Sequence, residues 1–258
     1  MSLTDHELSI LRDYAVHAAL AAGEIIASYQ GQQISYQLKQ GGTSVASRIV
    51  TQVDKEAEIA ILEVLNASIT EYDLGLLTEE STDNQTRFEK DYFWCIDPLD
   101  GTLPFLRNES GYATSIALVS RQGRAVLGVV NDPRNNNLYT AINGNGAYKN
   151  HDPFKRVLSD GATTIDNGPG GAVMQALLTI ENSPSIFFKK PKPEEGGGCL
   201  WDYAASSIIH YEAGGVNSDF NGKPLELNAK HSVFMNHCGV WFASGDTPQL
   251  RHEVQSHF

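Results

Sequence analysis

The segment at residues 92–102 constrains the fold most, because a hydrophobic run changes there abruptly into acidic and turn-forming residues. The run YFWCI at 92–96 is short and apolar at nearly every position, which is typical of a strand buried inside a sheet. The sequence DPLDGT follows at 97–102, and we predict that the strand ends at Asp97-Pro98. The pattern indicates a buried sheet with carboxylates at its edge.

The segments around this strand predict a mixed α/β fold. Residues 113–119, 124–130 and 138–141 alternate or run apolar and are separated by turn residues, which predicts antiparallel strands. Toward the N-terminus, a capping box at Thr4–Glu7 begins a helical pattern that continues to about Gly31. A second helical pattern starts near Asp54. Helices therefore precede the sheet along the chain.

The pattern changes after Asn150. A glycine-rich stretch at 168–171 leads into a helical pattern, and a further helix is predicted over 201–211, before Gly214-Gly215. We therefore predict an N-terminal α+β lobe at 1–150 and a C-terminal α/β lobe at 151–258.

Composition narrows the range of partners. Nineteen Lys and Arg residues against 31 Asp and Glu give a net charge of −12, which argues against binding to a nucleic acid polymer. No apolar run reaches the roughly 18 residues that a membrane helix needs, so no membrane association is expected. The three cysteines lie far apart without metal-binding spacing, and the N-terminus lacks a signal-peptide pattern. We predict a cytoplasmic protein.

The DPLDGT segment is the main candidate for chemistry. Asp97 and Asp100 flank a proline-fixed turn and can converge on one cation, while Gly101 permits close backbone approach to a ligand. The backbone amides near Asp100, Gly101 and Thr102 could cradle an anion. An ordinary turn with Asx hydrogen bonds is the alternative interpretation of this pentapeptide taken alone.

Further motifs bear on that choice. The segments VTQVD at 50–54, LTEES at 77–81, WCIDPLDGT at 94–102 and LWDYAA at 200–205, with EAGG at 212–215, occur in this order along the chain. Together they resemble the inositol monophosphatase superfamily. The resemblance implies the layered α-β-α-β-α sandwich of the sugar-phosphatase fold. It also implies a lithium-sensitive, magnesium-dependent phosphomonoesterase that forms a homodimer and acts on a small phosphorylated metabolite.

The resemblance also implies individual residue roles. It assigns Glu79, Asp97 and the Leu99 carbonyl to a first metal ion. It assigns Asp97, Asp100 and Asp202 to a second metal ion. In the same family, Asp54 with Glu79 helps to place a further metal and its waters, and Thr102 lies beside the nucleophilic water. Asp100, Gly101 and Thr102 are expected at the substrate phosphate. Hard oxygen ligands without histidine or thiolate favour Mg²⁺, with Mn²⁺ as a possible substitute. The resemblance implies two or three such ions.

Substrate choice stays open at this point. Glu195 stands seven residues before Asp202, where inositol-type members carry an acid that binds substrate hydroxyls, which favours a polyol phosphate. Lys189, Lys190 and Lys192 favour instead a second phosphate, as in a 3′(2′),5′-bisphosphonucleotide, unless they form an ordinary solvated basic loop. We place the bisphosphonucleotide slightly ahead.

Other activities remain as alternatives. They are a sugar or histidinol phosphate phosphatase and a catalytically silent metal-binding or regulatory member of the same fold. The sequence after Thr102 departs from the family pattern, because Leu103-Pro104-Phe105 replaces the usual asparagine- or glutamate-phenylalanine.

Overall fold

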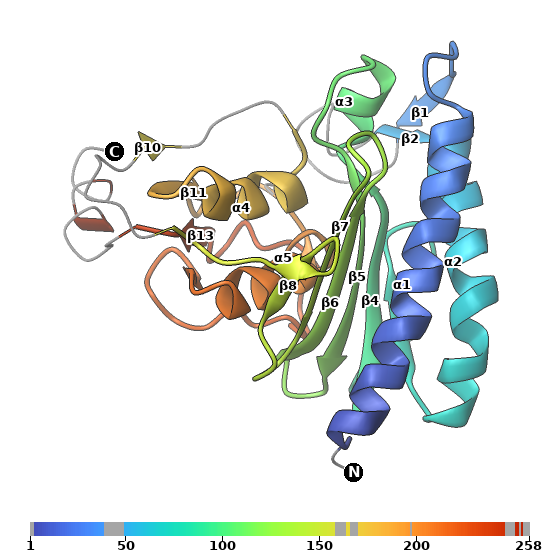
Figure 1. Cartoon of the computed structure of the whole chain (residues 1–258), viewed down its shortest axis with the longest axis horizontal. Coiled ribbons are helices and arrows are strands. Elements are labelled where there is room, and N and C mark those ends of the chain that lie inside the picture. Colours follow the sequence, from blue (N-terminus) through green and yellow to red (C-terminus); the bar gives the residue numbers. More distant parts are fainter. Residues whose placement is uncertain are drawn as a thin grey trace.

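A computed structural model describes residues 3–38, 49–157, 164–165, 170–196, 198–245, 251–252 and 254. Two long helices, α1 (Asp5–Ser28) and α2 (Gln52–Glu71), lie together on one face of a large sheet (Figure 1). The predicted capping box begins α1, since Glu7 N donates to Thr4 Oγ1 and Thr4 N donates to Glu7 Oε2. A short antiparallel pair, β1 (Tyr36–Leu38) and β2 (Ile49–Thr51), precedes α2.

The large sheet has seven strands. In spatial order they are β3 (Gly75–Thr78), β4 (Tyr92–Asp100), β5 (Ala113–Ser120), β6 (Ala125–Asp132), β7 (Asn137–Ile142), β8 (Ala147–Lys149) and β9 (Asp152–Pro153). Strand β3 pairs parallel to β4, and all later pairs are antiparallel. The predicted antiparallel strands after residue 113 are confirmed.

One sequence expectation about β4 is wrong. The strand does not end at Asp97-Pro98 but continues to Asp100, because Asp97 pairs with Ser115 and Asp100 with Ala113 across a register shift. The irregularity accommodates Pro98, which has no N–H to give to the ladder. The Asp97 side chain accepts from Leu99 N at 3.0 Å instead. The shift lets a strand with period-two alternation place two nearby carboxylates at one cavity.

The C-terminal half adds two helices and a second sheet. Helices α4 (Ala172–Glu181) and α5 (Leu200–Glu212) lie between the large sheet and a four-stranded sheet, as Figure 1 shows. The small sheet has the order β10 (Thr164–Ile165), β11 (Ser185–Lys189), β13 (Val240–Ala243) and β12 (Val216–Ser218). The described residues also include a 3₁₀ turn at Thr86–Phe88 and α3 (Thr102–Leu106).

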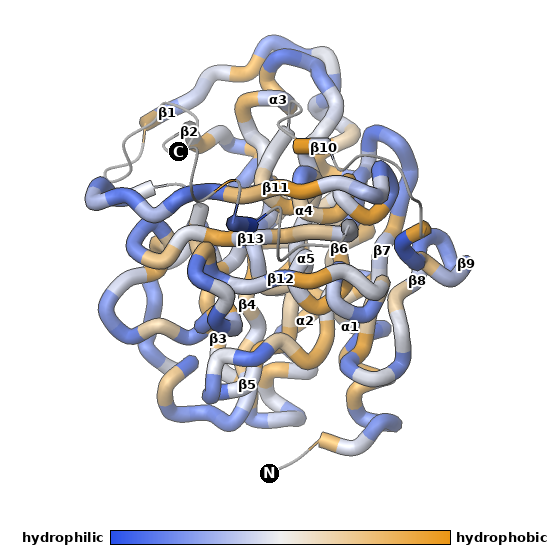
Figure 2. The backbone as a smooth tube through the Cα atoms, turned by 90° about the vertical axis from the view of Figure 1, so that its left-hand side faces the viewer, coloured by the Kyte–Doolittle hydropathy of each residue, from blue (hydrophilic) through white to orange (hydrophobic). Residues whose placement is uncertain are grey.

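The layers are held together by separate apolar cores. One core lies between α1, α2 and the large sheet, and another joins that sheet to α4 and α5. A smaller cluster on the small sheet includes Trp241 and the buried Val254 from the C-terminal end. Hydrophilic segments gather in peripheral loops (Figure 2). The layered α/β sandwich expected from the resemblance is confirmed.

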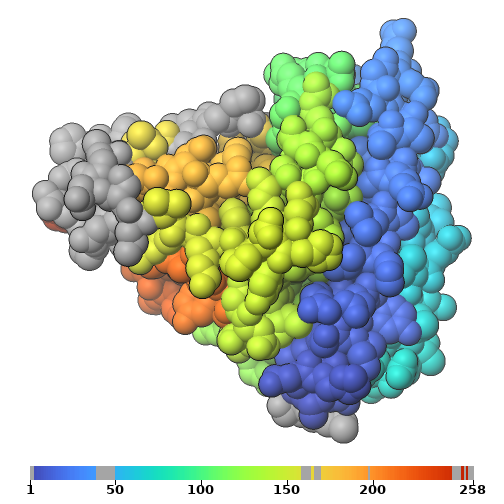
Figure 3. Space-filling model, viewed as in Figure 1, coloured from blue at the N-terminus to red at the C-terminus, as the bar shows by residue number. Residues whose placement is uncertain are grey.

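The two halves of the chain share a core. Phe93 and Val130 of the large sheet belong to the same apolar cluster as Leu177 of α4 and Ile209 of α5. In Figure 3 the gold and orange residues of the C-terminal half lie directly against yellow-green and green residues that precede them in the chain. The division at residue 150 stays a prediction, while the packing shows why the site can draw residues from both halves.

Candidate active site

An acidic cavity of about 320 Å³ lies where β4, α3, α4 and α5 meet. Among the residues of the described chain that line it are those named in the sequence analysis as metal and phosphate contacts: Glu79, Asp97, Leu99, Asp100, Gly101, Thr102 and Asp202. These residues come from three separate motifs. The fold therefore brings the motifs to one place.

Three carboxylates form the centre of this cavity. Asp97, Asp100 and Asp202 each offer an oxygen atom within 4.8 Å of the other two. Burial, and then the charge of Glu79, raises the pKa of Asp97 well above its usual value. Burial, and then the charge of Asp202, does the same to the pKa of Asp100. Ionising these carboxylates together is therefore costly.

Helix N-termini position two of these carboxylates. Asp100 accepts from Ala172 N at 3.2 Å and from Val173 N at 2.9 Å, the first amides of α4. Asp202 lies in the first turn of α5 and accepts from Cys199 N at 2.9 Å. Such amides stabilise anions, because they are unpaired within the helix and lie at its positive end. These amides thus hold the two carboxylates in fixed orientations.

Asp54 and Thr102 form a second polar unit beside the cluster. Asp54 sits in the first turn of α2 and accepts from Thr51 N at 2.8 Å and from Thr51 Oγ1. Its other oxygen lies 3.0 Å from Thr102 Oγ1, which is also 3.2 Å from the Leu99 carbonyl. Burial raises the pKa of Asp54 above its usual value, and the Thr51 hydroxyl opposes that shift.

Glycines allow the backbone segments of the site to meet. Gly101 has a φ of +84°, and a Cβ there would come within 2.8 Å of the Gly111 carbonyl. A Cβ at Gly171 would lie 2.0 Å from Asp100 Oδ2. Side chains at either position would push β4 away from the start of α4. The glycine-rich stretch noted in the sequence thus has a role in the site that sequence reasoning did not assign to it.

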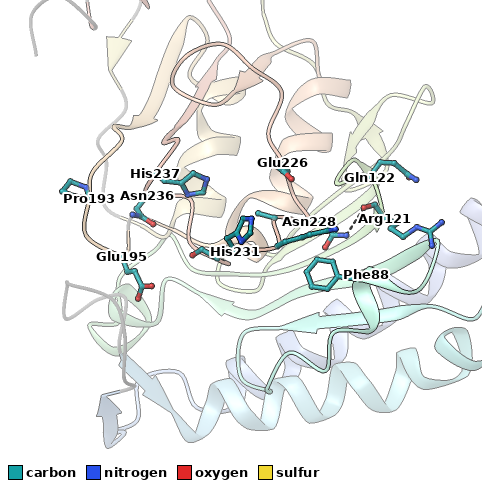
Figure 4. Close-up of a pocket in the computed structure, with 13 residues that line it drawn as sticks. Phe88, Arg121, Gln122, Pro193, Glu195, Glu226, Asn228, His231, Asn236 and His237 are labelled. Atoms are coloured by element: carbon teal, nitrogen blue, oxygen red, sulfur yellow. Dashed lines mark hydrogen bonds between the residues drawn. The ribbon is translucent and has the colours of Figure 1, made fainter.

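The four residues predicted to choose the substrate do not lie together. Lys189, at the end of β11, lines the acidic cavity. Glu195 lines a separate groove of about 860 Å³, together with Pro193, His231 and His237 (Figure 4). Lys190 and Lys192 line neither space, and the backbone of Lys192 is paired with Asn236.

Sequence reasoning missed several residues of the cavity wall. Arg107 and Glu109 follow α3 and line the cavity beside the predicted phosphate contacts. Cys199 and Phe234 form an isolated backbone bridge on the opposite C-terminal side and line it as well. Their proximity depends on tertiary pairing, so no local pattern could have shown it.

The sequence of this chain is similar to those of known proteins. The family model for the "Inositol monophosphatase family" matches residues 7–168. This chain belongs to the inositol monophosphatase family. Among its relatives, the Nus factor SuhB of Salmonella typhimurium is 32% identical, with 81% of this chain and 84% of that protein covered.

Two further likenesses cover nearly the full chain. The 3′(2′),5′-bisphosphate nucleotidase CysQ of Aggregatibacter actinomycetemcomitans is 28% identical over 95% of this chain and 96% of its own. The solved structure of an IMPase from Thermotoga maritima superposes with a TM-score of 0.75 at 24% identity, covering 95% of this chain and 96% of that one. The structural likeness shows the shared fold.

The donor set of the cavity fits a divalent cation. Buried carboxylates that repel one another are costly to ionise, and a cation with hard oxygen preference removes that cost. The Asp97, Asp100 and Asp202 cluster offers only oxygen atoms, and among the described residues no histidine or cysteine belongs to it. This chemistry favours Mg²⁺ or Mn²⁺ over zinc.

Proposed function

We propose that this protein is a Mg²⁺-dependent phosphomonoesterase whose substrate carries a second anionic group, most simply a 3′(2′),5′-bisphosphonucleotide. The observation that supports this choice is the placement of Lys189 in the acidic cavity, with Glu195 in a different groove. Homodimeric assembly and a cytoplasmic location remain predictions from the sequence.

The chain's own residues divide the work of the site. Glu79, Asp97, Asp100, Asp202 and the Leu99 carbonyl would hold two Mg²⁺ ions. When bound, these ions supply positive charge to the phosphoryl group and the leaving oxygen, and they lower the pKa of water. The α4 and α5 amides keep Asp100 and Asp202 in place while the cavity is loaded.

Thr102 and Asp54 can together orient the attacking water and accept a proton. The single hydroxyl proton of Thr102 can be shared with Asp54 Oδ1 or the Leu99 carbonyl, which leaves Thr102 Oγ1 able to accept from a water in the cavity. Burial raises the pKa of Asp54, and a raised pKa makes the carboxylate a better proton acceptor. Thr51 fixes its orientation. The pair would orient the attacking water through Thr102.

Lys189 supports the proposed preference for a doubly charged substrate. Its ammonium lies near the acidic cluster and acts to lower the pKa of Asp100, against the larger effects of burial and Asp202. Once cations neutralise the carboxylates, the ammonium can meet a second phosphate. A charge-assisted contact of this kind contributes about 1.5–3 kcal/mol. Glu195 would disfavour such a group, but it lines the other groove.

The relatives named Nus factor SuhB motivate a second candidate, a regulatory protein that keeps the fold without depending on turnover. The full set of Asp54, Glu79, Asp97, Asp100, Thr102 and Asp202 argues for catalysis, because a purely regulatory role has no chemical need for it. An inositol-type or sugar phosphate remains the alternative substrate class.

Phosphate release from a metabolite panel, with and without Mg²⁺, tests the proposal. The panel contains adenosine 3′,5′-bisphosphate, inositol 1-phosphate, histidinol phosphate and fructose 1,6-bisphosphate. We expect Mg²⁺-dependent release to be fastest with the bisphosphonucleotide, and millimolar Li⁺ to inhibit it more than Na⁺ at equal ionic strength. No release from any member would favour the regulatory candidate.

A lysine variant sharpens the substrate assignment. Lys189→Met should lower kcat/KM for adenosine 3′,5′-bisphosphate by roughly ten- to a hundredfold and scarcely change it for a monophosphate. Lys190→Met, one residue along the chain, is the matched control and should affect neither. Equal losses on both substrates would return the inositol-type substrate to first place.

A further inference from the structure

Glu58 is a buried acid of α2 that the family motifs in the sequence analysis do not include. Its side chain is 5% exposed, and it lies one helical turn after Asp54, which is also buried. Glu58 Oε2 accepts from Glu80 N at 3.0 Å, and Glu58 Oε1 accepts from the Ser81 hydroxyl. A buried carboxylate is costly unless donors satisfy it, so both contacts restrain the segment they come from.

That segment carries Glu79. The loop follows β3, and Glu79 N donates to the Ile96 carbonyl at 3.1 Å, which ties one side of the loop to β4. Ser81 N donates to Thr78 Oγ1 at 3.2 Å. Glu58 holds the far side of the same turn. The loop is therefore fixed to a strand on one side and to a helix on the other.

Helix α2 thus contacts two parts of the site with two carboxylates on one face. Asp54 meets Thr102 and Glu58 meets the residues just after Glu79. Residues four apart on a helix lie on the same face, so the spacing between these contacts is set by the helix itself. A rigid element that contacts both loops fixes their relative position.

We propose that Glu58 is a positioning residue that sets Glu79 relative to Asp97 for divalent-cation binding. The proposal rests on the cation site of the proposed function. Glu58 itself does not line the cavity. Its effect reaches the cavity through the backbone of Glu80, since a metal-binding carboxylate must be held to within fractions of an ångström by its surroundings.

Direct Mn²⁺ titration by calorimetry, without substrate, tests this role. Glu58→Met removes both acceptors at similar volume and should weaken Mn²⁺ binding at least tenfold, in line with the loss of a partner that supports a ligand. Glu58→Gln keeps one acceptor oxygen and should recover part of that affinity. Glu63→Met, at an exposed position of the same helix, is the matched control and should leave Mn²⁺ affinity within twofold of wild type.

Kinetics supply the second readout. In Glu58→Met the Mg²⁺ concentration for half-maximal phosphate release should rise, and saturating Mg²⁺ should restore kcat to near the wild-type value. Ser81→Ala removes only one donor to Glu58 and should shift Mn²⁺ affinity by a few fold; it serves as the main variant where Glu58→Met does not fold.

The outcomes separate the two proposals. Unchanged Mn²⁺ affinity in folded Glu58→Met, or in Ser81→Ala where that variant replaces it, overturns the role of Glu58 even when wild type hydrolyses the panel. Weakened Mn²⁺ binding in the variants supports the role of Glu58 even when wild type hydrolyses none of the panel. Failure of wild type to hydrolyse the panel would overturn only the proposed function.

Discussion

Two buried charged groups in this molecule behave in opposite ways. At the acidic cavity, Asp97, Asp100 and Asp202 lie together, and burial, followed by the charge of a neighbouring carboxylate, raises the pKa of Asp97 and of Asp100. At the junction between the two halves, Arg87 is equally buried, and its guanidinium donates to Asp83, Asn228 and the Ala229 carbonyl.

The contrast distinguishes a binding site from a structural clamp. The Asn228 side-chain amide in turn donates to the Arg87 and Arg121 carbonyls, so these polar groups satisfy one another at the junction. The aspartate cluster has amide donors at its edges, and Lys189 lowers the pKa of Asp100 by less than burial and the charge of Asp202 raise it. A buried charge that the protein satisfies stabilises the fold, whereas one that it leaves uncompensated awaits a ligand.

Of the substitutions that test this contrast, Asp97→Asn should have the largest effect. The amide keeps an oxygen for Leu99 N but loses the charge that would hold two cations, so we expect kcat to fall at least a hundredfold. The metal-free variant should melt no lower than wild type, because one repelling charge is removed. Steady-state phosphate release and a melting curve check both parts. Retention of more than about a tenth of wild-type kcat would mean that less than roughly 1.4 kcal/mol of the barrier depends on Asp97.

The structural clamp formed by Arg87, Asp83 and Asn228 should show the reverse pattern, with a loss of stability and little change in kcat. Arg87→Met keeps the side-chain volume but removes three donated contacts, and we expect the free energy of unfolding to fall by about 3 kcal/mol. The kcat measured well below the melting temperature should stay near wild type. Arg121→Met is the control, since its ion pair with Asp91 is nearly half exposed and should contribute little. Equal destabilisation by the two variants would contradict the clamp.

Much of this structure could be predicted from local sequence. The helix cap at Thr4 and the strands after residue 113 each follow from nearby residues. The motif resemblance also brought Glu79, Asp97, Asp100 and Asp202 into one set before any geometry was known. The end of β4 was predicted wrongly, because a register shift opposite Ser115 and Ala113 overrides the usual effect of proline.

What could not be predicted depends on pairing between distant segments. Lys189, Lys190 and Lys192 look equivalent in sequence, yet the end of β11 places only the first among the residues that line the acidic cavity. Glu195 has the expected spacing from Asp202 but lies along another groove. Glu58 has no motif of its own, and its contact with Ser81 joins residues 23 positions apart.

The smallest expected effect concerns how pH acts on the two charged groups. The pKa of Asp97 is raised in the folded state by burial and then by the charge of Glu79, so the metal-free protein binds protons more tightly than the unfolded chain. Its contribution to stability is complete below the unfolded-state pKa of about 3.9 and is lost as pH rises through the folded-state value.

We therefore expect the melting temperature of metal-free wild type, relative to Asp97→Asn, to fall as the pH is raised from 4 toward 8. Each kcal/mol corresponds to about 2–4 °C for a chain of this size. Mg²⁺ should reverse the fall in wild type by neutralising the cluster, and should do less in Asp97→Asn. The deficit of Arg87→Met should persist at every pH, since a guanidinium stays charged throughout. Parallel melting curves for wild type and Asp97→Asn at all pH values, with or without Mg²⁺, would show that the aspartate cluster is not the uncompensated charge described here.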